Sequence, residues 1–180
     1  MHHGLHLLMH LIRRAFGERI TNFLLNPLFG VIDGSDQPSE PQPLYSMAEA
    51  RRKQGRYPEA LVILRDQLEK FPHDFRTQMM MAEIEAENLR DVAAAETVIQ
   101  QLVAQQVHPP GSIFAALSTL GDWHLKYARD REAAGRCFEQ IAELFPGSEW
   151  AVRAAQRIAH LPTQAMLGGD SAASLILPHV

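Results

Sequence analysis

The sequence predicts an all-α protein whose main part is a right-handed solenoid of about three helical hairpins, closed by a C-terminal helix. Alanine, leucine, glutamate, glutamine and arginine are abundant, and these side chains lose little rotamer freedom in a helix. Valine, isoleucine and threonine never alternate with polar residues at a period of two, so no strand is predicted. Pro72, Pro109 and Pro146 recur at intervals of 37 residues, each at a predicted helix end, which indicates a repeat.

Length and composition place the chain among globular proteins. It has 180 residues, of which 46% are hydrophobic and 21% charged, enough for an apolar core. The net charge of −4 argues against nucleic acid as a partner, because neutralising phosphates needs a basic face. The single cysteine, Cys137, excludes an internal disulfide bond.

Residues 1–32 are predicted to form an amphipathic helical segment. The charge-free runs 1–12 and 20–32 are shorter than the ~20 residues that span a bilayer. The basic residues follow the first apolar run, so a cleaved signal peptide is not predicted. The segment can lie in a membrane interface, dock on the solenoid or form a dimer. Apolar surface on both sides of the arginines favours an anionic membrane surface, contacted by Leu8, Ile12, Arg13, Arg14, Phe16, Arg19, Phe23 and Leu24.

Residues 33–43 are predicted to be an extended linker. Pro38, Pro41 and Pro43 stand among Asp33, Asp36 and Glu40, and proline-rich segments act as semi-rigid spacers that reach ~30 Å over this length. The linker separates the N-terminal segment from the solenoid, residues 44–161. Residues 162–180 lack periodicity and are predicted to be a flexible tail.

The first hairpin shows the pattern most clearly. Pro58 suits the first turn of its second helix, since its missing N–H needs no partner there. Apolar residues then follow at helical spacing, Pro72 prevents continuation, and Asp74 is a good N-cap for the next helix. The stripe consists of Leu61, Leu64, Leu68 and Phe71.

The same organisation is predicted twice more. In the second hairpin the first helix is expected at about 75–88, and Asp91 is the expected N-cap of the second helix. In the third hairpin Ser112 is the expected N-cap, and Pro146 ends the second helix. A final helix at about 149–161, capped by Ser148, has no partner helix and is predicted to cover the third hairpin.

At these residues the chain resembles the tetratricopeptide repeat (TPR) family. In hairpin one, Gly55, Tyr57, Ala60 and Pro72 resemble the second-helix signature. In hairpin three, the matching residues are Leu117, Leu120, Gly121, Ala134, Phe138 and Pro146. The period is 37 residues instead of the family's 34, and the first-helix tryptophan is absent. Residues 145–161 look like the last repeat of bacterial cell-envelope members of the family.

The resemblance implies a concave groove, lined by the first helices, that takes a peptide or helix of another protein. Transferring the family register gives Tyr45, Glu49, Arg52, Lys53, Met79, Glu83, Glu87, Asp122 and Lys126 as groove residues. Basic residues then gather at the hairpin-one end and acidic residues in the middle. A solvated helix face is the alternative interpretation of these charged positions.

Motifs for catalysis are not found. The sequence has no Gly-rich phosphate loop, CxxC or HExxH, so no catalytic residue, metal ligand or cofactor is predicted. His2, His6 and His10 are spaced to share one helical face, and His3 would add a fourth imidazole, which leaves a metal-dependent enzyme as a minor alternative. His124 and His160 are expected to pack against the core, and Cys137 to be a small buried hydrophobe.

The sequence therefore predicts a non-enzymatic interaction module, tethered by its N-terminal helix to a membrane or a larger assembly. An accessory subunit of a bacterial envelope-biogenesis machine is the second hypothesis. The expected location is cytoplasmic, peripheral to the inner membrane. The partner's identity and the oligomeric state are left open.

Overall fold

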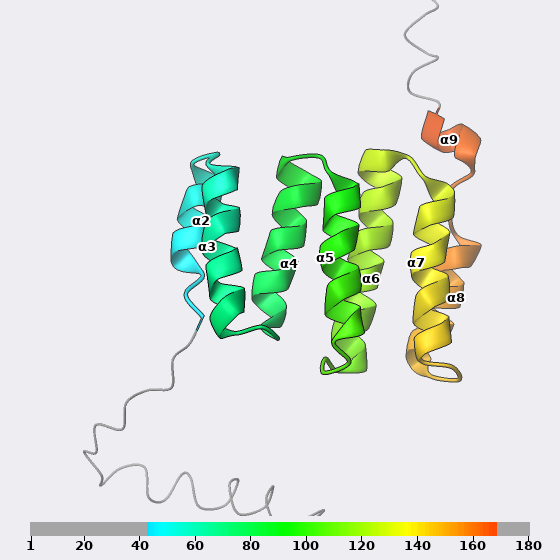
Figure 1. Ribbon diagram of the computed structural model, residues 1–180. Coiled ribbons are helices and arrows are strands. Elements are labelled where there is room, and N and C mark those ends of the chain that lie inside the picture. Colours follow the sequence, from blue (N-terminus) through cyan, green and yellow to red (C-terminus); the bar gives the residue numbers. More distant parts are fainter. Residues whose placement is uncertain (1–42, 169–180) are drawn as a thin grey trace, which may run out of the picture. The chain divides into compact units, whose positions relative to one another are not determined.

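The computed structural model describes residues 43–168, which all belong to one compact unit, residues 42–180. Within this range every regular element is a helix, as predicted (Figure 1). The predicted N-terminal helix and most of the linker lie outside the described residues.

Three helical hairpins follow one another along the chain. The first pairs α2 (Ser46–Lys53) with α3 (Tyr57–Lys70). The second pairs α4 (Phe75–Glu83), extended by the π-helical segment η1 (Ile84–Asn88), with α5 (Val92–Ala104). The third pairs α6 (Pro110–Trp123), extended by η2 (His124–Ala128), with α7 (Arg131–Leu144). Each helix packs on the next in the chain, which gives the predicted solenoid of stacked hairpins.

Two further helices follow the third hairpin. The helix α8 (Glu149–Ala159) packs on α7 and also contacts α6, so it covers the last hairpin as predicted. The short helix α9 (Gln164–Gly168) lies in the segment for which the sequence predicts a flexible tail. Hydrogen bonds hold this segment to the turn before α7. Arg131 Nε donates to the Pro162 carbonyl (2.9 Å), and Gln164 Nε2 donates to the Arg129 carbonyl (3.0 Å).

Side chains cap four helices at their N-termini. Asp74, Asp91 and Ser148 accept from the backbone N–H groups of Thr77, Ala94 and Ala151, as the sequence predicts, and Asp130 accepts from Ala133. These bonds satisfy donors that have no partner inside the helix.

The boundary between α5 and α6 differs from the prediction. The helix α5 ends at Ala104, and Gln106 has a φ of 56°. Pro109, expected to end this helix, instead has an extended backbone and precedes α6, which begins at Pro110. Ser112 therefore lies inside the first turn of α6 and does not cap it. The reason is that proline suits the first helical position, where no N–H is required.

The π-helical segments at the ends of α4 and α6 accommodate extra residues of the 37-residue repeat. Leu89 N donates to the Ile84 carbonyl (3.0 Å), the i to i+5 bond of a π-turn. Each π-segment is followed by a residue in the left-handed region, Arg90 with φ 59° and Arg129 with φ 54°, where hairpin one has Gly55 with φ 73°. This backbone costs a non-glycine residue roughly 1–2 kcal/mol. Both arginines also make outside contacts, Arg90 with the Tyr127 ring and Arg129 with the Leu167 carbonyl.

The apolar core forms two clusters. One contains residues of hairpin one together with Met80, Met81 and Ile84, and the other runs from α4 to α8. Ala60, Ala82 and Ala134 are fully buried, and Ala60 and Ala134 are the small residues by which the second helices resemble the TPR signature. Small side chains at these positions let paired helices approach closely.

Candidate partner-binding face

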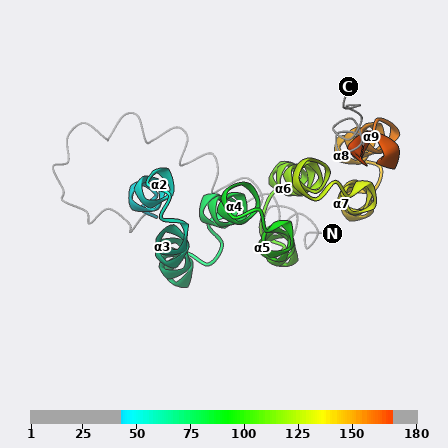
Figure 2. The ribbon, with the colours of Figure 1, turned by 90° about the horizontal axis from the view of Figure 1, so that it is seen from above.

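The first helices of the hairpins form one side of the stack. Seen end-on, α2, α4, α6 and α8 lie on one side of the row, and α3, α5 and α7 lie on the other (Figure 2). All nine groove residues predicted from the sequence belong to α2, α4 and α6, to their π-helical extensions, or to the residue just before α2. We call this side the first-helix face.

A pocket of about 300 Å³ opens on this face between α2 and α4. Its walls include four of the predicted groove residues, Glu49, Arg52, Met79 and Glu83. Three further wall residues, Phe75, Arg76 and Met80, were not predicted as groove residues. Because Phe75 and Met79 are half-buried and Met80 is buried, the pocket combines apolar surface with charged groups.

The charged groups of this pocket pair with one another. Arg52 Nη1 lies 2.9 Å from Glu83 Oε2, and its Nη2 lies 3.1 Å from Glu87 Oε2. Its Nε donates to Asn88 Oδ1 (2.8 Å). The sequence placed free positive charge at the hairpin-one end of the face, and the structure corrects this for Arg52. Its guanidinium is half-buried and joins α2 to α4 and η1. Lys53, its neighbour, is exposed.

Tyr45 anchors the start of α2 to the start of α4. Its hydroxyl donates to the carboxylate of Asp74, with 2.9 Å between Tyr45 Oη and Asp74 Oδ1, while Asp74 also caps α4. Burial, followed by the bond to Asp74, raises the pKa of Tyr45 above its ordinary value. The phenol therefore stays a donor. The guanidinium of Arg76 lies 4.1 Å from the centre of the Tyr45 ring and pairs with Glu49 (2.8 Å).

Glu87 connects all three hairpins. One carboxylate oxygen accepts from Arg52 on α2, and the other accepts from Trp123 Nε1 on α6 (3.2 Å). Its contacts fix the relative position of the first helices, so this predicted groove residue also has a structural role. Lys126, further along the face, is exposed, with its Nζ 5.0 Å from the centre of the Tyr127 ring.

A second pocket, of about 490 Å³, opens on the same face near α6 and α8. It is lined by Phe114, Arg153, Gln156, Arg157 and His160, none of which the sequence analysis placed in the groove. Asp122, which it did place there, pairs with Arg157 at the edge of this pocket. His160 is exposed, and the expectation that it packs against the core is wrong.

Three residues of α8 and its C-cap His160 are absent from the predicted groove because the sequence favours a capping role for this helix. The sequence does contain a signal for their position. Arg153, Arg157 and His160 follow at spacings of four and three, which place them on one side of a helix. This side adjoins the one that carries the fully buried Ala154, since Arg157 follows Ala154 by three residues. The helix α8 thus occupies the place of a fourth first helix.

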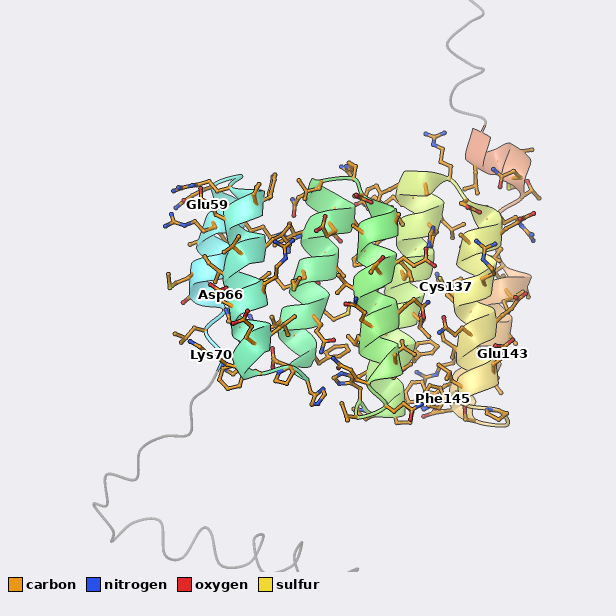
Figure 3. All side chains as sticks on the ribbon, in the orientation of Figure 1. Glu59, Asp66, Lys70, Cys137, Glu143 and Phe145 are labelled. Carbon is orange, nitrogen blue, oxygen red and sulfur yellow. The ribbon has the colours of Figure 1, made fainter. Side chains whose placement is uncertain are left out.

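No group of three histidine, cysteine or acidic residues within 43–168 is arranged to hold a metal ion. Cys137 is buried in the core on α7, as predicted (Figure 3). Burial, with a smaller contribution from Glu96, raises the pKa of its thiol to about 12. The thiolate needed for nucleophilic attack is therefore scarce at neutral pH.

His124 is buried on η2, in agreement with the prediction that it packs against the core. Its Nε2 lies 3.2 Å from Glu96 Oε2, yet neither ring nitrogen makes a well-directed hydrogen bond within the described range. The distance alone allows an electrostatic contact without an aligned bond. The N-terminal histidines lie outside the described residues. No helix in the described range is long and apolar enough to cross a membrane.

Comparison with known proteins gave one kind of similarity. No protein-family model matches the sequence, and no curated protein matches it significantly. Among solved structures, the chain is similar to the first TPR of Spaghetti (RPAP3) bound to the HSP90 peptide SRMEEVD. The two share 20% sequence identity, with a TM-score of 0.45, over 71% of this chain and 90% of that chain. The chain's own stacked hairpins, with Ala60 and Ala134 buried between helices and Gly121 on α6, make it a TPR-like helical repeat protein.

Proposed function

We propose that this chain is a non-enzymatic interaction module that binds a segment of another protein on its first-helix face. The observation that carries the proposal is the presence of two pockets on this face, one between α2 and α4 and one near α6 and α8. Each pocket offers an aromatic or methionine side chain beside charged groups. A protein segment with apolar anchors and polar flanks matches this combination, since pockets for apolar anchors set affinity and charged rims set orientation.

Binding on this face takes advantage of a rigid scaffold. Arg52, Glu87 and Trp123 connect the three hairpins before any partner arrives. A preformed surface loses less conformational freedom on association than a flexible one. The partner's side chains therefore meet Met79 and Phe114 in positions that the fold already determines.

Site-specific photocrosslinking in the full chain tests the proposal. A photoreactive residue replaces Met79 or Phe114 on the first-helix face, or Val62 or Gln101 on the second helices α3 and α5. We expect protein adducts from the first pair only. The adducts are identified by mass spectrometry, and the captured protein is then purified and titrated directly. Equal adducts from both faces would contradict the proposal.

Quantitative binding to that purified partner gives the second measurement. Arg76 is exposed and lies on the pocket wall, so Arg76→Glu should weaken binding by about tenfold, equivalent to ~1.4 kcal/mol. Arg65→Glu on α3 makes the same charge change away from the face and should leave the affinity unchanged. Melting temperatures of both variants exclude loss of the fold as the cause.

We further propose that residues 1–32 tether the module to an anionic membrane surface. The support is the sequence pattern of two apolar runs separated by Arg13, Arg14 and Arg19, because arginines near anionic head groups gain up to ~1 kcal/mol each. The full chain should bind anionic vesicles less strongly as salt is added, and residues 44–180 alone should not bind. A stable dimer that ignores vesicles and is lost on truncation would make the segment an oligomerisation element.

The envelope-biogenesis hypothesis is decided by the same crosslinking experiment. A captured component of an envelope machine would favour it, and a partner from another process would exclude it. Metal analysis of the full chain, purified without a histidine tag, decides the remaining alternative, in which the N-terminal histidines serve a metal-dependent enzyme.

A further inference from the structure

The pocket near α6 and α8 differs from the α2–α4 pocket in its charge. The walls of the α2–α4 pocket contain two arginines and two glutamates, and Arg52 and Arg76 are each paired with one of them. The walls of the α6–α8 pocket contain Arg153, Arg157 and His160, and no carboxylate. A guest in this second pocket therefore meets cationic donors without an acidic group on the wall.

The two arginines retain free donors. Nη2 of Arg157 forms an ion pair with Asp122. Nη2 of Arg153 lies 3.5 Å from Glu149 Oε2. Among the described residues the Nε and Nη1 groups of both arginines donate to no partner. An arginine offers five N–H donors in a planar arrangement suited to a carboxylate. Each guanidinium can thus donate to a further carboxylate while its ion pair with Asp122 or Glu149 stays in place.

Aromatic rings hold both guanidinium groups in place. The Arg153 guanidinium lies 5.0 Å from the centre of the Trp150 ring, and that of Arg157 lies 4.6 Å from the centre of the Phe138 ring. Phe114, on the pocket wall, packs against Trp150 with 5.2 Å between ring centres. Such stacking restricts the arginine side chains and reduces the entropy lost when they bind an anion. Phe114 adds apolar surface beside the donors.

His160 has a defined orientation next to them. Its Nδ1 donates to the Gln156 carbonyl at 2.7 Å, so the neutral ring carries its proton on Nδ1. The amide side chain of Gln156 stands between the two arginines in sequence and is exposed. It makes no hydrogen bond within the described part of the chain, which leaves this position open to substitution.

We infer that the α6–α8 pocket binds an acidic segment of the partner protein, with a carboxylate on Arg153 and Arg157 and a neighbouring apolar side chain on Phe114. The inference rests on the proposed function and specifies its chemistry. It also gives the bound segment a direction, because its acidic part lies at the α8 end of the first-helix face. The guanidinium of Arg52 on α2 is paired with Glu83 and Glu87, whereas Arg153 and Arg157 at the α8 end keep donors for a further carboxylate.

The test uses the full chain and a fluorescein-labelled peptide of alternating glutamate and leucine, with a lysine–leucine peptide as its charge-reversed counterpart. Fluorescence anisotropy should show binding of the acidic peptide and about tenfold or weaker binding of the basic one. The double substitution Arg153→Glu and Arg157→Glu should weaken binding of the acidic peptide by about tenfold or more, because charge-assisted hydrogen bonds are lost. Arg65→Glu with Arg136→Glu on α3 and α7 is the matched control and should have no effect.

Because Arg157 also covers Phe138, its replacement can disturb the core. Gln156 provides a variant pair that leaves these contacts intact. Gln156→Lys should tighten binding of the acidic peptide and Gln156→Glu should weaken it, each by about threefold. The reason is that each substitution adds a single charge beside the bound anion. The same two substitutions at Gln101 on α5 are the control and should leave the affinity unchanged.

Three results with the peptides would overturn the inference. The first is equal or tighter binding of the basic peptide, and the second is no binding of either peptide. The third is an affinity for the acidic peptide that is the same in Gln156→Lys and Gln156→Glu. All three leave the proposed function to be decided by crosslinking at Met79 and Phe114. Anionic vesicle binding that is lost with Arg153→Glu and Arg157→Glu, without a change in peptide affinity, would assign the pocket to lipid head groups instead.

Discussion

Gly121 on α6 faces the ring of Phe138 on α7 so closely that a Cβ atom at position 121 would lie 2.8 Å from Phe138 Cζ. Phe138 is fully buried, so the ring has little room to withdraw. The absence of a side chain at this one position thus sets how closely the two helices of hairpin three approach. It gives a physical reason for the glycine that the TPR resemblance singled out.

Gly121→Ala should therefore lower the free energy of unfolding by ~1–3 kcal/mol, because overpacking a core contact outweighs the gain in helix propensity. Gly135 on α7 is the matched control. An added Cβ there would lie 3.6 Å from Leu161 Cδ1, an ordinary contact, so Gly135→Ala should stabilise by up to ~1 kcal/mol. Urea unfolding measures both. Stabilisation by both substitutions would show that α6 and α7 are further apart than described.

The bridge from Arg52 through Glu87 to Trp123 should couple the hairpins energetically. Arg52→Ala should cost about 1 kcal/mol, since the pair is only half-buried and partly screened by solvent. Lys53→Ala, one residue away and exposed, should change stability by less than ~0.5 kcal/mol.

A double-mutant cycle measures the coupling directly. Arg52→Ala and Glu87→Ala together should cost less than the sum of the two single changes by about 0.5–1 kcal/mol, and added salt should reduce this difference. Strict additivity in urea unfolding would mean that the carboxylate of Glu87 does not hold α2 in solution.

Cys137 should be unreactive in the folded chain. Burial raises the pKa of its thiol to about 12, so at pH 8 the group is protonated and shielded from reagents. A disulfide reagent such as Ellman's should modify it only as fast as the chain unfolds, and rapidly in guanidinium chloride. Fast modification under native conditions would place the thiol at the surface.

The same shift predicts a loss of stability in alkali. The folded state disfavours the thiolate, so its pKa lies above that of the unfolded chain, ~8.5. The contribution of this group to stability is complete below that value and falls as the pH rises toward 12. Cys137→Ala should remove this part of the pH dependence, which melting curves between neutral and alkaline pH can follow.

Removing α8 should expose the apolar surface of hairpin three. The helix α8 buries Ala154 and places Arg157 over the Phe138 ring. A chain ending at residue 148 should aggregate, because a solenoid needs its terminal repeat covered. A chain ending at residue 168 keeps α8 and α9 and should remain monodisperse in size-exclusion chromatography to the same extent as the full chain. Equal behaviour of the two truncations would contradict the capping role.

The sequence by itself determined the order of the hairpins in the described range. Local signals carry this information, because Pro58 must lie in a first turn and the caps Asp74, Asp91 and Ser148 bond backbone groups only three residues away. Helical periodicity also identified the buried face, since Ala60, Leu64 and Ala134 differ from their neighbours in character within a single turn.

Tertiary structure alone decided which charged residues are free to bind. Arg52 and Arg153 look alike in the sequence, but Arg52 finds Glu83, Glu87 and Asn88 more than thirty residues away. Such pairing depends on how hairpins stack, which no local pattern encodes. The same holds for α8, whose sequence describes an amphipathic helix equally suited to a cap or a groove wall. Only its packing on α6 and α7 places Arg153, Arg157 and His160 beside Phe114, because the positions of side chains from different hairpins are fixed by contacts distant in sequence.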